Sequence, residues 1–269
     1  MRAILVLSLT MIFFGSELFA GGHSSTLQDV KARGKLRCVV TTGLPGFAAP
    51  DANGVWRGFD WDFCRATAAA VLGDANAVDP ITSTGKTRFT KLNAGEGDVL
   101  WRNTTITFSR DVSVKLRFLG VNYYDGQGFM VNKSLGVSSA KELDGASVCI
   151  QTGTTTELNL ADYFSSNNMS YEAVTIETND EARQNYEAGR CDIYTTDASG
   201  LASTRSSLPN PNDHMVLPEI ISKEPLGPAV RQGDDAWADI ITWVLAATIT
   251  AEAVSYTHLR AHETHDHLV

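Results

Sequence analysis

The sequence is short of basic residues. Of its 269 residues, 22 are Lys or Arg and 31 are Asp or Glu, so the formal net charge is −9. No basic patch occurs along the chain, which argues against nucleic acid as a partner. The acidic net charge fits a protein that handles small molecules. Hydrophobic residues make up 43% and charged residues 20%, a balance typical of a globular protein.

Long apolar segments are also scarce. After the first twenty residues we find no stretch that is long and apolar enough to cross a bilayer. The first twenty have the pattern of an export signal, with Arg2, a short apolar run from Ala3 to Phe14, and an end at the small residue Ala20. We expect a signal peptide at residues 1–20 and an exported protein. The alternative is a buried first helix.

Cysteine is sparse, and no two of the four cysteines are close enough for a CxxC zinc or redox motif. In an oxidising compartment an even number of cysteines suggests disulfides. Three pairings are possible, and the sequence alone does not choose among them. We favour Cys38–Cys64 and Cys149–Cys191, because each pair would fall within one of the lobes expected below. Four reduced, buried thiols are the alternative.

Strand-like and helix-like segments alternate along the chain, which predicts parallel sheets covered by helices. The two halves share one pattern, because Ala94–Asp98 and Ala188–Asp192 both carry a Gly and an Asp before an apolar strand. This indicates two similar α/β lobes with a ligand cleft between them, against the alternative of one continuous domain. Expected strands cover 35–40, 98–101, 146–150, 170–176, 191–195 and 229–230; expected helices cover 27–33, 59–72, 88–93, 156–167, 180–188 and 234–250.

A threonine-rich turn, Gln151–Glu157, joins an expected strand to an expected helix. Gly153 permits the sharp turn, and three threonines follow where the helix begins. Free backbone N–H groups and the helix dipole favour a carboxylate or phosphate at such a place. An ordinary capped helix is the alternative.

Polar residues also follow the two Gly-Asp strands. Asn103, Thr105 and Arg110 follow the first, and an arginine can hold a carboxylate in two charge-assisted hydrogen bonds. Asp197 follows the second and suits an ammonium group. A cationic corner and an acidic corner together predict a site for a free α-amino acid. The alternatives are a surface arginine and a helix N-cap.

Six motifs along the chain are informative in combination. They are Gly58–Cys64, Arg102–Thr107, Asn122–Phe129, Gln151–Glu157, Gly189–Asp192 with Asp197, and Glu224–Arg231. Together they resemble the solute-binding proteins of polar amino-acid ABC transporters, above all the general L-amino-acid subfamily. The resemblance implies a two-lobed, type II periplasmic-binding-protein fold. Lobe 1 would cover residues 26–125, lobe 2 residues 126–226, and the return to lobe 1 residues 227–253.

The resemblance also implies roles for single residues. Arg110 would pair with the ligand α-carboxylate, aided by Asn103, Thr105 and the backbone N–H of Thr155, with Thr156 in the same turn. These residues form the carboxylate corner of the expected site.

Asp197 would bind the α-ammonium. Asp60 lies where relatives contact a polar ligand side chain, although it would equally suit the start of the helix 59–72. Two departures from the family pattern concern aromatic residues: Phe47 stands in a shifted position, and no aromatic lies near Gly85. Both changes would widen the side-chain pocket and fit broad specificity.

The implied function is that of a periplasmic, monomeric carrier without a cofactor. It would capture free L-amino acids and deliver them to an inner-membrane ABC permease by closing about glycine-containing hinges at 123–128 and 223–227. Two other functions remain open. An exported dehydratase would need a general acid in the cleft, and a receptor sensor domain would need a membrane span.

The C-terminal residues do not continue the pattern of the rest. Residues 254–264 match one translated reading frame of a transposase sequencing-library adapter, and residues 267–269 resemble a flow-cell adapter. We therefore expect residues 254–269 to be non-native and the native sequence to be cut off near Ala253. The four histidines of this stretch then carry no metal site.

Resequencing the locus tests the adapter hypothesis. We expect the genomic reading frame to depart from this sequence after about residue 253. A genomic sequence that encodes the same tail without interruption would contradict the hypothesis.

Overall fold

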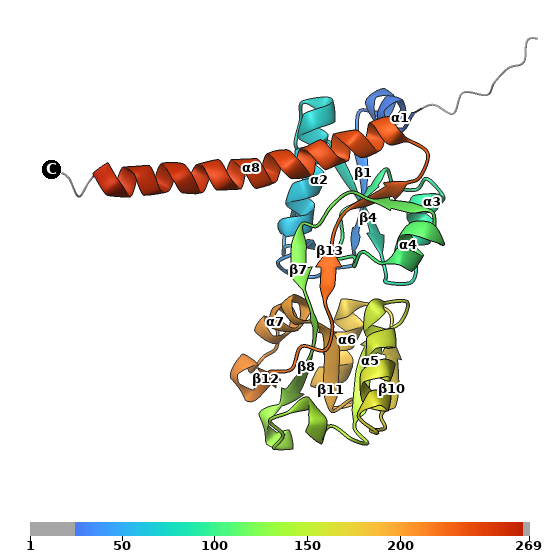
Figure 1. Ribbon diagram of the computed structural model, residues 1–269, viewed down its shortest axis with the longest axis vertical. Coiled ribbons are helices and arrows are strands. Elements are labelled where there is room, and N and C mark those ends of the chain that lie inside the picture. The colour runs from blue at the N-terminus through green and yellow to red at the C-terminus, as the bar shows by residue number, and fades with distance from the viewer. Residues whose placement is uncertain (1–24, 266–269) are drawn as a thin grey trace, which may run out of the picture.

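Two α/β lobes are stacked end to end and joined by two crossover strands in the computed structural model, which describes residues 25–265 and their side chains as far as Val254 (Figure 1). The crossover strands are β7 (Tyr123–Asp125) and β13 (Glu224–Leu226). They pair antiparallel to each other, with Glu224 opposite Asp125. The predicted two-lobed fold is confirmed.

Lobe 1 contains a five-stranded sheet in the order β4-β1-β5-β14-β6. Strand β1 is parallel to β4 and β5, whereas β14 is antiparallel to β5 and β6. The strands are β1 (Leu36–Thr41), β4 (Val78–Ser83), β5 (Val99–Leu100), β6 (Leu116–Phe118) and β14 (Ala229–Arg231), with a small hairpin of β2 (Ala49–Pro50) and β3 (Trp56–Arg57). The helices are α1 (Thr26–Arg33), α2 (Phe59–Leu72), α3 (Arg88–Asn93), α4 (Phe108–Val112) and α8 (Asp235–His265).

Lobe 2 repeats this arrangement in the order β10-β9-β11-β8-β12. Strands β9, β10 and β11 are parallel, and β8 is antiparallel to both β11 and β12. The strands are β8 (Gln127–Asn132), β9 (Ser147–Gln151), β10 (Glu172–Ile176), β11 (Ile193–Asp197) and β12 (His214–Val216). The helices are α5 (Thr155–Ser166), α6 (Asn179–Glu187) and α7 (Ala198–Ser206), with single turns η1 (Lys133–Leu135), η2 (Ala140–Glu142) and η3 (Pro211–Asp213).

The carboxyl ends of the parallel strands in both lobes face the junction between the lobes. The loop that follows β5 bridges to β13 through Thr105 and Leu226. The turn that follows β9 reaches the same crossover, where Thr155 bonds to Glu224. Ligands of open α/β sheets bind at such strand ends, so the topology alone directs attention to this junction.

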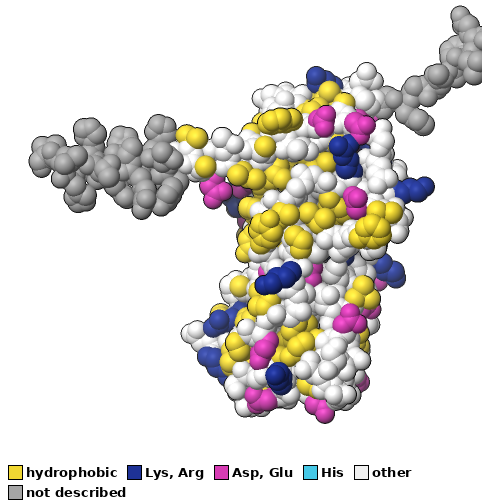
Figure 2. Space-filling model, viewed as in Figure 1, with side chains coloured by type: hydrophobic (Ala, Val, Ile, Leu, Met, Phe, Trp, Pro, Cys, Tyr) yellow, Lys and Arg dark blue, Asp and Glu magenta, His cyan; other side chains and the backbone are white. Residues whose placement is uncertain are grey.

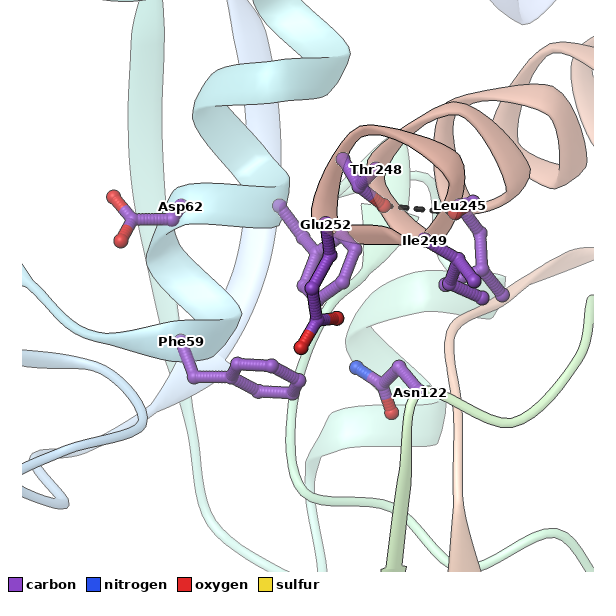
Figure 3. A pocket seen from close by; sticks show the side chains of 8 residues that line it. Phe59, Asp62, Asn122, Leu245, Thr248, Ile249 and Glu252 are labelled. Atoms are coloured by element: carbon purple, nitrogen blue, oxygen red, sulfur yellow. Dashed lines mark hydrogen bonds between the residues drawn. The ribbon is translucent and has the colours of Figure 1, made fainter. Parts of the chain in front are cut away.

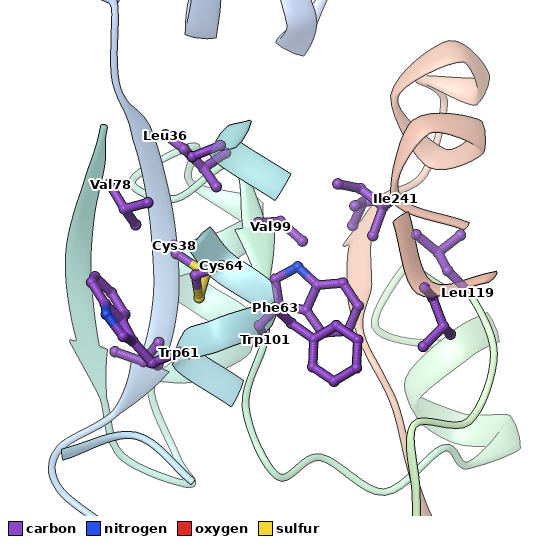
Figure 4. Close-up of a cluster of buried hydrophobic side chains, with 14 of the residues drawn as sticks. Leu36, Cys38, Trp61, Phe63, Cys64, Val78, Val99, Trp101, Leu119 and Ile241 are labelled. Carbon is purple, nitrogen blue, oxygen red and sulfur yellow. A yellow bond between two sulfur atoms is a disulfide. The ribbon is translucent and has the colours of Figure 1, made fainter. Parts of the chain in front are cut away.

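A stack of aromatic rings forms the centre of the lobe 1 core (Figure 4). Phe63 from α2 lies flat on Trp101 from the end of β5, with ring centroids 4.5 Å apart. The buried indole N–H of Trp101 donates to Thr67, so its polar atom is satisfied. A disulfide from Cys38 to Cys64 fastens β1 to α2 beside this stack.

Lobe 2 has its own core and its own disulfide. Cys149 in β9 is joined to Cys191, just before β11, and both residues are buried. The two bonds are the pairing expected from the sequence, one bond in each lobe.

Every segment expected to be a strand or helix lies on an element of that type, but the expectation left out several elements, among them strands β4, β6, β8 and β12 and helix α4. Strand β4 was missed because it contains Pro80 and buries only its two end residues. As an edge strand it tolerates a proline. Helix α8 continues to His265 instead of ending near Thr250.

Helix α8 also corrects the expectation that no second segment is apolar enough to cross a membrane. Its part Asp235–Val254 has the length and composition for a span, with a mean hydropathy of 1.3. A core helix passes the same test, and Trp237, Ile241 and Leu245 belong to the lobe 1 core. The outer face is less covered, since Trp243 is 73% exposed.

Two calls from the sequence fall wholly or partly outside the described part of the chain. The expected signal peptide, residues 1–20, precedes it, and the side chains of the expected adapter tail after Val254 are not described. Within the described residues no group of three or more His, Cys, Asp or Glu side chains is placed to hold a metal ion.

The second disulfide gives a stability prediction. Replacing both Cys149 and Cys191 with Ala frees a loop of 42 residues, and we expect the free energy of unfolding to fall by about 3–4 kcal/mol. Urea unfolding of the oxidised protein, followed by far-UV circular dichroism, measures the change. An unaltered midpoint would show that the bond does not constrain the unfolded chain.

Candidate functional site

A small cavity lies between the lobes, where the strand ends meet. Its volume is about 20 Å³, room for about one water molecule. Every residue that lines it is polar or charged, and both lobes contribute. The lining residues are Arg88, Arg102, Asn103, Thr105, Gln151, Thr154, Thr155, Thr156, Thr196 and Asp197.

Arginines from lobe 1 make one side of the site cationic. Arg88, at the start of α3, is 2% exposed and donates to Thr104 Oγ1 and to the carbonyl of Asn103. Arg110, in the short helix α4, is 7% exposed and donates to the carbonyl of Thr105 over 2.8 Å. Both guanidinium groups lie over the ring of Phe89, at 4.8 and 5.2 Å from its centroid.

Burial lowers the pKa of Arg88, Arg102 and Arg110, the three arginines at the site. It brings the pKa of Arg102 and of Arg110 to about 10, so both remain charged at neutral pH. For Arg88, burial and repulsion from the other two arginines hold the pKa well below its usual value. Charges of one sign gathered in a buried place favour an anion from outside.

Several buried polar atoms beside the cavity have no hydrogen-bond partner among the described residues. They include Nε of Arg88, Nε of Arg102 and Oδ1 of Asn103. A buried donor without an acceptor costs about 1–3 kcal/mol, so native proteins seldom leave one. These atoms indicate that the cavity is built to receive a polar molecule.

Asp197 forms the acidic side of the site. It ends β11 and stands at the N-cap position of α7, but its side chain makes no capping hydrogen bond. Burial, with help from Asp125 and Glu224, raises the pKa of Asp197 to about 7, while Arg88 and Arg102 act against the rise. A cationic ligand group would restore its full negative charge.

Asp60 lies in the first turn of α2 and is 1% exposed. It does not line the cavity. Burial raises its pKa to about 7, against the charge of Arg102 and hydrogen bonds from Asn103 and Asn122. The N-cap of α2 is Gly58, so Asp60 does not cap that helix.

The threonine-rich turn adopts the strand-turn-helix form expected for it. Gly153 has a φ of +70°, and a side chain there would come within 2.9 Å of Lys86 in lobe 1. Thr154 is the N-cap residue of α5, but its hydroxyl donates to the carbonyl of Gln151 and makes no cap bond. The first N–H groups of α5 are therefore not satisfied by this side chain.

Gly85 and Phe47 do not widen the cavity in the way expected from the sequence. A side chain at Gly85 would come within 2.8 Å of Thr154 Cγ2, so glycine here permits the lobes to approach each other. Phe47 packs edge-on against Phe59 and Tyr123. It lines a separate groove of about 430 Å³ at the mouth between the lobes.

Of the seven ligand residues expected from the sequence, five line the cavity: Asn103, Thr105, Thr155, Thr156 and Asp197. Arg110 adjoins them through Thr105, and Asp60 is linked to them by a hydrogen bond from the backbone of Asn103. Sequence reasoning gave no individual site role to Arg88, Arg102, Gln151, Thr154, Thr196 or Glu224. Four of them lay inside quoted motifs, which was the available signal: Arg102, Gln151, Thr154 and Glu224.

A larger pocket, of about 260 Å³, lies within lobe 1 between α2 and α8 (Figure 3). Apolar side chains of Phe59, Leu245 and Ile249 form much of it, with Asn122 and Glu252 at its edge. Hydrophobic side chains also gather on the surface of this lobe below α8 (Figure 2). The pocket lacks the buried, unpartnered polar groups of the interlobe cavity, so the latter is the candidate site.

Two similar lobes, two crossovers and a polar cavity between them define a protein of the solute-binding class. Residues 36–257 match the family model of the bacterial extracellular solute-binding proteins, family 3, and the chain belongs to this family.

Relatives of known name agree with this membership. The chain is 61% identical over 256 residues to the glutamate/glutamine/aspartate/asparagine-binding protein BztA of Rhodobacter capsulatus, covering 93% of this chain and 76% of that protein. It is 56% identical to the general L-amino acid-binding periplasmic protein AapJ of Rhizobium johnstonii, covering 93% and 74%. A solved periplasmic binding protein of an ABC transporter from Brucella ovis, with glutathione bound, has a TM-score of 0.84 and 55% identity, covering 87% and 73%.

The raised pKa of Asp60 predicts how stability depends on pH. Below about pH 4 the carboxyl is protonated in both states, and above it the unfolded chain loses the proton first. The folded chain keeps the proton until about pH 7. The free energy of unfolding therefore falls between these values and then levels off.

Asp60→Asn removes this dependence because the amide never ionises. We expect the variant to match the original protein near pH 4 and to exceed it in stability by about 2–4 kcal/mol at pH 8. Urea unfolding of ligand-free protein at both pH values measures the difference. A difference that is the same at both would contradict a buried, neutral Asp60.

Proposed function

We propose that this protein captures free L-amino acids in the periplasm and delivers them to an inner-membrane ABC permease. The observation that carries the proposal is the cavity between the lobes, with arginines on one side and Asp197 on the other. Only a ligand with both an anionic and a cationic group would satisfy both sides. The names of the relatives BztA and AapJ support amino acids as the ligand class.

In this proposal the α-carboxylate lies at the cationic side, against Arg110, Asn103 and the first N–H groups of α5. The α-ammonium lies against Asp197. Arg102, with its unpartnered Nε, faces the ligand side chain, and Asp60 lies behind Arg102. Acidic and amide side chains both suit such a pair, because the arginine donates and the carboxyl can accept or donate.

Closure of the lobes is the step that the permease would detect. Lobe 2 already holds lobe 1 through Asn179, which donates to Thr41 Oγ1 over 3.0 Å, and through Ser203, which donates to the carbonyl of Pro45 over 2.7 Å. The ligand drives closure through its stronger binding to the closed form. The crossover strands β7 and β13 would carry the change in dihedral angles.

We also propose that the protein is a carrier and has no catalytic role. A dehydratase would need a general acid. Asp60 and Asp197 are the candidates, because both hold protons near neutral pH. Asp197 is needed for the ammonium, and Asp60 does not line the cavity. Export through residues 1–20, lobes at 26–125, 126–226 and 227–253, and a monomeric state belong to the same proposal.

Calorimetric titration of the purified chain with L-glutamate, L-glutamine, L-aspartate and L-asparagine tests the function. We expect binding of all four, and a loss of about 10-fold to 100-fold in affinity for Arg110→Ala and for Asp197→Ala, because each removes a charged hydrogen-bond partner. No binding of any of the four would contradict the proposal.

Exposed residues provide the controls for this test. Arg57 pairs with Asp51 at the surface of lobe 1, and its side chain is 71% exposed. Asp79 pairs with Lys35 at another surface position. We expect Arg57→Ala and Asp79→Ala to leave the affinities within about 2-fold, since surface ion pairs contribute little. Equal losses in these variants would show a general effect of charge.

A further inference from the structure

Two turns, one from each lobe, touch each other at the junction. The turn of lobe 1 lies between β4 and α3 and contains Gly85 and Lys86. The turn of lobe 2 lies between β9 and α5 and consists of Thr152, Gly153 and Thr154. Gly85 is buried, but it does not line the interlobe cavity. Its contact with lobe 2 is therefore separate from the candidate ligand site.

Gly85 has room for a hydrogen but not for a side chain. A Cβ there would lie 2.8 Å from Cγ2 of Thr154 and 2.9 Å from the carbonyl oxygen of Thr152. Both atoms belong to lobe 2. Contacts this short oblige one partner to move, and a backbone oxygen cannot turn aside as the end of a long side chain can. The lobes themselves would have to separate.

The facing glycine, Gly153, meets the same restriction from the other side. A Cβ on Gly153 would lie 2.9 Å from Cα and 3.1 Å from the backbone N of Lys86. Gly153 also has a φ of +70°, which favours glycine by itself, whereas Gly85 has no positive φ. Gly85 thus requires glycine because of the facing lobe and not because of its own backbone.

Hydrogen bonds within each lobe hold the two turns in shape. In lobe 1, Thr84 and Thr87 each donate a backbone N–H to the other's hydroxyl, over 3.0 and 3.2 Å. In lobe 2, the hydroxyl of Thr154 donates to the carbonyl of Gln151 over 2.7 Å. Because neither turn is free to change shape, their meeting limits how far the lobes can close.

We propose that Gly85 is a positioning residue for ligand binding, whose backbone forms with the turn at Gly153 a closure stop that sets how near the lobes come in the closed form. This inference rests on the proposed function. The closed form leaves about 20 Å³ between the polar groups of the two lobes. A side chain at position 85 would hold the lobes apart and lengthen every contact that depends on both lobes. The effect would be the same for every amino-acid ligand.

Gly85→Ala and Gly85→Val test the closure stop with side chains of increasing size. The added group opposes only the closed form, because separated lobes have space for it. We expect radiolabelled L-glutamine, chased with unlabelled ligand, to leave Gly85→Ala about 10-fold faster and Gly85→Val faster still. The association rate should stay within about 2-fold, because the ligand first meets the open form. An unaltered dissociation rate in both variants, or a loss in the association rate alone, would overturn the inference.

Two further measurements separate a closure stop from other effects of Gly85→Ala. Damage within lobe 1 would lower the thermal unfolding midpoint of the ligand-free protein, whereas a closure stop leaves it within about 2 °C. A methyl group in contact with the ligand side chain would weaken L-glutamine more than L-asparagine, which is shorter by one methylene. A closure stop weakens both by the same factor. A lowered midpoint, or a loss confined to L-glutamine, would overturn the inference.

Lys86→Ala is the matched control in the same turn. It keeps the backbone and the Cβ that face Gly153 and removes only the outer part of an exposed side chain. We expect L-glutamine to dissociate within about 2-fold of the original rate. A rise as large as that of Gly85→Ala would show sensitivity to any change in this turn and overturn the inference alone. No binding of any tested amino acid by the original protein would overturn the proposed function and this inference with it.

Discussion

The pairing of two short strands, β7 with β13, is the constraint on which the rest of the structure depends. Each crossover leads directly into the fourth strand of a sheet, β8 in lobe 2 and β14 in lobe 1. Because both fourth strands start from the same pair, the carboxyl ends of the neighbouring parallel strands face each other. Residues more than a hundred positions apart, such as Thr105 and Glu224, thereby come into contact. The position of the candidate site is a consequence of this topology.

Burial of charge is the second constraint. Arg88, Arg102 and Arg110 lie beside Asp197 and Glu224 in a region that water hardly reaches. Removing charges from water costs several kcal/mol for each ion unless partners replace the lost hydration. The pKa values of Arg102 and Arg110 are lowered and that of Asp197 is raised, which indicates that other protein groups replace the lost hydration only in part. A zwitterionic ligand would supply further partners for these charges, which would favour such a ligand over a neutral one.

The two lobes are stabilised separately, which suits a protein that moves about a hinge. Each has its own apolar cluster and its own disulfide, and neither disulfide crosses the junction. The contacts between lobes include hydrogen bonds, such as those of Asn179 and Ser203. Hydrogen bonds of this kind exchange with water at a small net free energy. The lobes can therefore separate without exposing a core.

The sequence by itself determined the local features of this protein. Apolar spacing and glycines located the strand-turn-helix at Gly153, and polar residues after strands pointed to Asp197 and Arg110. The pattern shared by the two halves indicated two lobes, and family motifs supplied the type of fold and most of the residues that line the cavity. These features are readable because they depend on neighbours within a few residues. The edge strand β4 was missed because Pro80 and its exposed middle residues hide the usual pattern.

The tertiary structure decided which groups meet across the junction and in what state. The engagement of Thr105 and Thr155 by Glu224, the burial of Arg88, and the raised pKa of Asp60 all require segments from different parts of the chain. Local spacing carries no information on such distances. Whether a hydroxyl donates or accepts depends on its partners, and the charge of a carboxyl depends on its partners and on the exclusion of water. Only folding brings the partners together and excludes the water.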